Sequence, residues 1–177
     1  MRYSVRFIAL CLVVSGLIAS CSKKSTPAPP PQPTTREINV KFLVQNQNLS
    51  SFWKVTALYL QTDPGDTTVA KMTLVPLDAY YKSALPYLGI NFLGDGNAGN
   101  SSIITETAGG TWGLDASGTV LSVTPKDQPK EVSDIRVNSA GMSFGSYTKF
   151  DTPVTFRDGA ATPVKAYAKY VVYVWGS

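Results

Sequence analysis

Hydrophobic and polar residues alternate with a period of two along most of the chain after residue 36. The first such run places Ile38, Val40, Phe42 and Val44 on one face, with polar residues between most of them. Because alternate side chains of a strand point to opposite faces, this pattern predicts a half-buried β-strand. Similar runs predict further strands at 52–61, 68–75, 87–93, 102–107, 111–114, 119–124, 132–137, 141–149, 154–156 and 164–175.

Short segments rich in Gly, Asp and Asn separate these predicted strands. The clearest are 63–66 (DPGD), 94–97 (GDGN) and 115–118 (DASG). Glycine adopts positive φ without strain, and Asp and Asn side chains bond to nearby backbone, so the segments are typical of hairpin connections. The pattern predicts only one helix, of one or two turns, at 77–84 before Pro86.

Evenly spaced short strands with such turns indicate either an antiparallel barrel or a sandwich. Residues 170–175 are apolar on both faces, as expected for a strand with one face in an interior and the other face covered. A closed barrel also has no unpaired sheet edges. We therefore expect an all-β, antiparallel up-and-down barrel, with an immunoglobulin-like sandwich as the alternative.

The first twenty-one residues have the order of a secretory signal. Arg2 and Arg6 precede an apolar run at 8–18, and small residues then lead to Cys21. A retained transmembrane helix is the alternative, but the run is shorter than the roughly 20 apolar residues that span a bilayer. The segment 18–21 (IASC) resembles the lipobox of bacterial lipoproteins, which implies cleavage before Cys21 and acylation of its sulfur, by palmitate among other fatty acids.

Three parts follow along the chain. We expect a lipoprotein signal peptide at 1–20, the acylated Cys21 with a linker at 21–35, and one β domain at 36–177. Residues 25–35 (STPAPPPQPTT) are rich in proline, which lacks a backbone donor, so this stretch is predicted to be an extended spacer. Ser22 beside the cysteine is similar to outer-membrane sorting signals, which implies an anchor in the outer membrane, facing the periplasm or the cell surface.

The composition narrows the possible chemistry. The chain has no histidine, which excludes Ser-His-Asp and Cys-His catalysis and histidine-based metal sites. A pair of carboxylates remains possible, but most acids lie beside Gly or Pro, where a turn role suffices. The net charge is only +4 and the lysines are scattered, which argues against nucleic-acid binding. We expect a non-enzymatic protein without a cofactor.

One loop offers oxygen ligands at alternating positions. Asp95, Asn97 and Asn100 could hold a hard cation such as calcium. The later bidentate Glu of a full calcium loop is missing, so an ordinary hairpin is the favoured interpretation.

Several segments in the second half of the chain carry a family resemblance. The segments 110–114 (GTWGL), 118–124 (GTVLSVT), 132–137 (VSDIRV) and 142–144 (MSF) look like the strand rhythm of bacterial lipocalin-like lipoprotein domains. Residues 88–96 (LGINFLGDG) are similar to the strand and turn that precede the first of these segments in that family. The Gly-x-Trp that this family usually has near its first strand is absent, and Phe52-Trp53 is the nearest substitute. The immunoglobulin-like sandwich therefore remains the alternative fold.

The aromatic residues are the last candidates for a site. Tyrosine is amphipathic and rigid, and a group of such side chains can line a pocket for a small molecule. Tyr80, Tyr81 and Tyr87 flank an irregular connection, and together with Trp112 they are the predicted ligand-binding residues. We expect a barrel that binds a small apolar or amphipathic ligand. The alternative is a non-catalytic module that docks on another envelope protein or on glycan.

Overall fold

The computed structural model describes residues 29–44, 52–65, 68–85, 87–138, 143–157 and 159–176, with the backbone alone at 81–83. The chain divides into the units Met1–Gln32 and Pro33–Ser177, and the fold described here is that of the second unit. The predicted signal peptide, Cys21 and most of the linker lie outside the described residues. No helix within the described ranges is long and apolar enough to cross a membrane.

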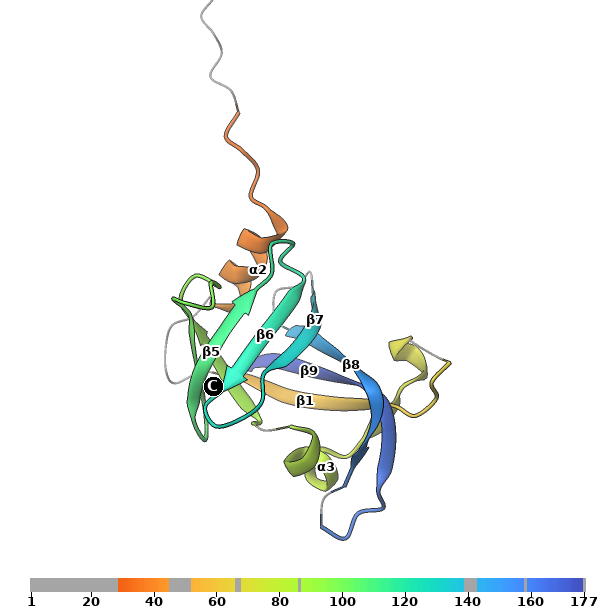
Figure 1. The fold of residues 1–177 in the computed structure, drawn as a ribbon. Coiled ribbons are helices and arrows are strands. Elements are labelled where there is room, and N and C mark those ends of the chain that lie inside the picture. The colour runs from red at the N-terminus through yellow and green to blue at the C-terminus, as the bar shows by residue number, and fades with distance from the viewer. Residues whose placement is uncertain are drawn as a thin grey trace, which may run out of the picture. The chain divides into compact units, whose positions relative to one another are not determined.

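Eight antiparallel strands form a closed up-and-down barrel (Figure 1). Consecutive strands pair from β3 to β9, and β9 pairs with β1 to close the cylinder. The predicted barrel is therefore confirmed over the sandwich. The strands are β1 (Phe52–Gln61), β3 (Gly89–Leu93), β4 (Ser102–Thr105), β5 (Gly109–Leu114), β6 (Val120–Pro125), β7 (Glu131–Val137), β8 (Ser143–Phe156) and β9 (Val164–Gly176).

Strand β1 has one neighbour along one of its edges and two successive neighbours along the other edge. One edge pairs with β9 over its whole length, with a register shift between Val55 and Ala57. The other edge pairs first with β3, at Trp53, and then with the short strand β2 (Thr73–Val75), at Leu58 to Leu60. The predicted strand at 68–75 is wrong in its first half, where the 3₁₀ helix η1 (Val69–Lys71) precedes β2.

The strand predicted from Ile38 to Val44 is also wrong, because Thr35–Leu43 form the helix α2. The Thr34 hydroxyl accepts a hydrogen bond from the Glu37 backbone N–H, and the Glu37 carboxylate accepts one from the Thr34 N–H. This reciprocal capping box satisfies two backbone donors at the helix start. Thr34 and Thr35, which the sequence assigned to the linker, are thus the N-cap and first residue of α2.

The remaining predicted elements are confirmed with small changes. The helix at 77–84 is α3 (Leu77–Ala84). The separate strands predicted at 141–149 and 154–156 are one long strand, β8, whose pairing with β9 is interrupted between Lys149 and Val154. This interruption matters for the site, because it lies at one end of the barrel.

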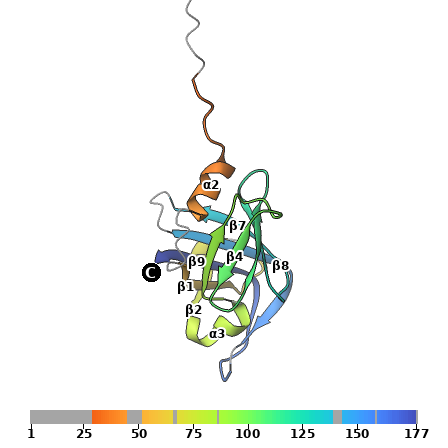
Figure 2. The ribbon, with the colours of Figure 1, turned by 90° about the vertical axis from the view of Figure 1, so that its left-hand side faces the viewer.

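The helix α2 covers the opposite end of the barrel. Asn39 donates its side-chain N–H to the carbonyl of Gly118, and Arg36 donates to the side-chain oxygen of Asn97, at 2.9 and 2.8 Å. These contacts lie on the β5–β6 and β3–β4 turns. Successive turns of an up-and-down barrel alternate between its ends, so the β4–β5 and β6–β7 turns form the other end, called the mouth here. Figures 1 and 2 show α2 and α3 at opposite ends of the barrel.

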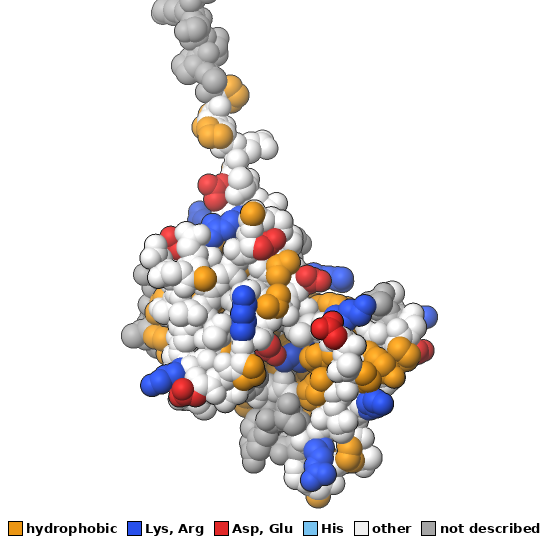
Figure 3. All heavy atoms as spheres, in the orientation of Figure 1, with side chains coloured by type: hydrophobic (Ala, Val, Ile, Leu, Met, Phe, Trp, Pro, Cys, Tyr) orange, Lys and Arg blue, Asp and Glu red, His pale blue; other side chains and the backbone are white. Residues whose placement is uncertain are grey.

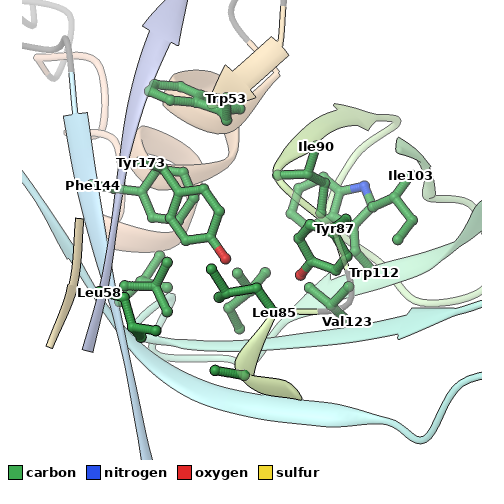
Figure 4. Packing of buried hydrophobic residues seen from close by; sticks show 14 of the residues in the cluster. Trp53, Leu58, Leu85, Tyr87, Ile90, Ile103, Trp112, Val123, Phe144 and Tyr173 are labelled. Atoms are coloured by element: carbon green, nitrogen blue, oxygen red, sulfur yellow. The ribbon is translucent and has the colours of Figure 1, made fainter. Parts of the chain in front are cut away.

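Large aromatic side chains fill the barrel between these ends (Figure 4). Phe144 stacks on Tyr173 with ring centroids 4.6 Å apart, and it packs nearly perpendicular to Trp53 with centroids 5.1 Å apart. Phe92 contacts Trp112 at 5.0 Å. A cavity of about 10 Å³ remains among these side chains, which is room for about one water molecule. A ligand larger than about one water molecule must therefore bind outside this packed centre.

Candidate functional site

A pocket of about 640 Å³, called the mouth pocket here, opens at the mouth of the barrel. Its wall is formed by the end of α3, the residues just before β3, the β4–β5 and β6–β7 turns, β8 and β9. This volume lies within the range of about 300–1,000 Å³ that is common for small-molecule sites. In the view of Figure 3, acidic and basic side chains lie close together near the centre of the domain, beside a group of hydrophobic side chains.

Apolar side chains make up much of the pocket wall. Leu85 follows α3, Tyr87 precedes β3, and Phe150, Val154 and Phe156 come from the far half of β8. The ring centroids of Phe150 and Phe156 lie 5.7 Å apart, with Phe150 inside the interruption of β8 and Phe156 beyond it. The extension of the β8–β9 hairpin past this interruption therefore supplies one apolar side of the pocket.

A partly buried ion pair lies in the pocket wall. Lys169 on β9 is paired with Glu131 at the start of β7, and its ammonium also donates to the carbonyl of Ala84, 3.0 Å away. The Lys169 side chain is 6% exposed and that of Glu131 is 32% exposed. The carboxylate is thus the more accessible partner of the pair.

A second carboxylate stands at the edge of the pocket. Glu106, just after β4, accepts hydrogen bonds from the backbone N–H groups of Leu88 and Gly89, the latter at 2.9 Å. These bonds hold the carboxylate against the first residues of β3. Glu106 and Glu131 are therefore both held in defined positions around the pocket.

Tyr87 lies between the pocket and the aromatic centre, since it contributes to the walls of both cavities. Burial raises the pKa of its phenol, and the charges of Glu131 and Glu106 raise it further. Burial also raises the pKa of Tyr173, and the nearby phenol of Tyr87 raises it further. Both phenols are therefore neutral hydrogen-bonding groups near pH 7.

Among the predicted binding residues whose side chains the structure describes, Tyr87 alone lines the pocket. Tyr80 is buried, and its hydroxyl donates to the carbonyl of Thr162 at 2.9 Å, which ties α3 to the β8–β9 turn. Trp112 is buried against Phe92 and donates its indole N–H to a backbone carbonyl in the core. The side chain of Tyr81 and the whole of Cys21 lie outside the described residues.

The loop considered for a cation has its own internal hydrogen bonds. The Asp95 carboxylate accepts bonds from the backbone and side-chain N–H groups of Asn97, both at 2.9 Å, and from the Ser101 hydroxyl at 3.2 Å. These bonds lower the pKa of Asp95, and the Asn100 N–H closes the turn on the Asn97 carbonyl. The part of the chain that the structure describes contains no cluster of three or more potential His, Cys, Asp or Glu ligands.

A row of side chains on the outside of the barrel is a separate feature. Tyr59 on β1 faces Leu74 on β2 and Tyr170 on β9, and Tyr170 in turn faces Tyr147 on β8. Directly paired residues point to the same face of a sheet, so these four form one transverse outer row. The three tyrosines are half-buried and Leu74 is 60% exposed.

Comparison with known proteins adds no family to this description. No protein-family model matches the chain, and no curated protein is significantly similar to it. The features that bear on function are therefore the closed barrel, the mouth pocket and the outer row. Of these, the pocket has the concave shape and the mixture of apolar walls and a few polar groups that suit a small ligand.

Proposed function

We propose that this protein binds a small amphipathic molecule in the mouth pocket and has no catalytic role. The observation that carries the proposal is the pocket of about 640 Å³, with apolar walls and a partly buried ion pair, at one end of a packed barrel. Pockets of this kind gain affinity from apolar burial and orientation from a few polar groups. The barrel would act as the rigid support for the site.

The pocket wall suggests how the ligand would lie. Its apolar part would contact Leu85, Phe150 and Phe156, while its polar part would face Glu131 and Glu106. Because aromatic side chains fill the barrel centre, the ligand would stay at the mouth and would not enter the cylinder.

We further propose that the protein is an outer-membrane lipoprotein anchored through acylated Cys21. The support is the sequence pattern of 2–21 and the proline-rich stretch after it. Several acyl chains together give firm membrane attachment, since each buried methylene contributes about 0.8 kcal/mol. Mass spectrometry of the protein isolated from a bacterial envelope would test this, because acylation adds a defined mass to the peptide that begins at Cys21.

Dye binding would test the pocket. Residues 33–177 form a compact unit with its own core, so a chain of residues 29–177 is suitable for measurement with Nile red, a neutral apolar dye. We expect Val154→Arg, which places a long charged side chain in the pocket wall, to weaken binding about tenfold or more, a change of about 1.4 kcal/mol.

Val132→Arg is the matched control. Val132 is similarly exposed, at 47% against 38% for Val154, and it lies on β7 outside the pocket wall. This variant should bind the dye as the unchanged protein does. Equal weakening by both substitutions, or no binding by the unchanged protein, would contradict the proposal.

The outer row favours a second candidate function, which is docking on glycan through tyrosine rings. Tyrosine combines a flat apolar face with a polar tip, which suits contact with sugars. If this candidate is correct, the protein should sediment with purified cell-wall glycan, and Tyr170→Ser should reduce the bound fraction severalfold. Val154→Arg should leave that fraction unchanged.

A further inference from the structure

Negatively charged side chains around the mouth pocket are more numerous and more accessible to solvent than positively charged ones among the residues that the structure describes. The described side chains that line it include two carboxylates, Glu106 and Glu131, and one ammonium, that of Lys169. Lys169 is almost fully buried and already contacts Glu131 and the Ala84 carbonyl. A ligand entering from solvent would therefore meet carboxylate oxygens before it met the ammonium.

Glu106 adds to this negative field in a fixed position. Its carboxylate is held by the backbone N–H groups of Leu88 and Gly89, and the residue is exposed at the edge of the pocket. The charges of Glu106 and Glu131 both act on Tyr87, which lines the pocket, and both raise the pKa of its phenol. The two carboxylates thus lie close enough to the same wall to act together.

We infer that the ligand of the mouth pocket carries a cationic head group, such as a protonated amine, and that the pocket rejects carboxylates of the same length. The inference depends on the proposed ligand-binding function and specifies the ligand class. A cationic head can approach the exposed side of Glu131 while Lys169 keeps its present partners.

An anionic head has no comparable position. To reach Lys169 it must displace Glu131, which would leave that carboxylate beside the apolar wall without its partner. Breaking this pair is unfavourable, because the displaced Glu131 carboxylate loses its charge partner and then lies beside the negative head group of the ligand. The pair therefore excludes anions, and the apolar wall accepts the hydrocarbon part of either kind of molecule.

Three matched probes test the inference on the chain of residues 29–177. Decylamine, decanol and decanoate each have ten carbon atoms in one unbranched chain and differ in head-group charge at pH 7. We expect isothermal titration, below micelle-forming concentrations, to show decylamine binding about tenfold or more tighter than decanoate, with decanol between them. Added salt should narrow the difference, because ions screen charges at a partly exposed site.

Two outcomes separate the inference from the function on which it depends. If decanol and decanoate bind as tightly as decylamine, the inference is overturned and the proposed binding function stands. If none of the three binds, the proposed function is overturned and the inference with it.

Two variants identify the groups responsible. Glu131→Gln removes the counter-ion of Lys169, and decanoate should then bind at least as tightly as decylamine. Glu106→Gln leaves the ion pair intact, and should reduce the preference for decylamine severalfold without changing the affinity for decanol.

Asp134→Asn is the matched control, since Asp134 is an exposed acid on β7, the same strand as Glu131, and is outside the pocket wall. It should leave the order of affinities unchanged. A reduction as large as that of Glu106→Gln would show that general surface charge, and not the pocket, selects the amine, and would overturn the inference.

Discussion

Trp53 donates its indole N–H to the carbonyl of Leu43, 2.9 Å away, and so joins the first barrel strand to the end of α2. Leu43 is the last residue of that helix, where backbone carbonyls have no partner within the helix. The Trp53 ring is fully buried and lies 4.9 Å from the ring of Phe42, also on α2. One side chain therefore satisfies the helix end and packs the helix against the core.

Replacing Trp53 with Phe should destabilise the protein by about 2–3 kcal/mol. The change leaves the Leu43 carbonyl without this donor and removes one ring from a closely packed cluster. Urea unfolding followed by circular dichroism would measure the loss. Trp175→Phe, at a half-buried position near the end of β9, should cost clearly less, and equal losses would contradict the role given to Trp53.

The capping box gives a second prediction. Thr34→Ala removes the hydroxyl that accepts the Glu37 N–H bond, and should cost about 1 kcal/mol. Thermal unfolding would measure it, with Thr35→Ala as the control because Thr35 is the exposed first residue of the helix. A loss from Thr35→Ala as large as that from Thr34→Ala would show that the cap contributes little.

The same helix shows where the sequence prediction failed. Ile38, Val40, Phe42 and Val44 alternate as in a strand, yet the buried residues are Asn39, Phe42 and Leu43. That spacing of three and four is helical, and the pair Thr34 and Glu37 is a capping-box signature that could have indicated it. The later strands were predictable because each is bounded by turn residues, whereas α2 has a proline-rich segment on one side only.

The pocket was harder to predict than the fold. Its wall joins residues from 84–88, 106, 131, 150–156 and 169, which a barrel brings together only after it closes. Tyr87 was predictable from its irregular surroundings. Lys169 also left a signal that the sequence analysis did not use: it alternates in step with Val171 and Tyr173, so its side chain could have been predicted to point to the same, inner face. Glu131 lies beside a turn, and its sequence context gave no signal that it belongs to the pocket.

Gly145 on β8 provides space for an aromatic side chain on the outer row. A Cβ built at Gly145 would overlap the phenol of Tyr170 on the neighbouring strand. Gly145→Ala should therefore displace that ring and destabilise the protein by about 1–3 kcal/mol. Gly109→Ala is the control, because its Cβ would meet no atom closer than 3.6 Å. Combining Gly145→Ala with Tyr170→Ala should cost less than the sum of the two changes, as unfolding midpoints would show.

The carboxylate of Asp115, in the β5–β6 turn, makes the stability of the fold depend on pH in the acid range. Hydrogen bonds from the Ser117 hydroxyl and the Val120 N–H hold the pKa of Asp115 at about 2, below its usual 3.8. Because the folded-state pKa is the lower one, the carboxylate stabilises the fold above about pH 4, and this contribution is lost as the pH falls towards 2. The gap in melting temperature between the unchanged protein and Asp115→Asn should shrink across this window. A constant gap would contradict the assignment.

The two members of the Lys169–Glu131 pair should differ in what their loss costs. Glu131→Met leaves an almost fully buried ammonium with the Ala84 carbonyl, whereas Lys169→Met leaves a carboxylate that is one-third exposed and can be solvated. We expect about 2–4 kcal/mol for the first change and about 1–2 kcal/mol for the second, because an unpaired charge costs more the deeper it is buried. The double variant should lose at least about 1 kcal/mol less than the sum, since it leaves neither charge behind. Urea unfolding of the four proteins would measure this coupling, and strictly additive losses would show that the two side chains do not stabilise each other.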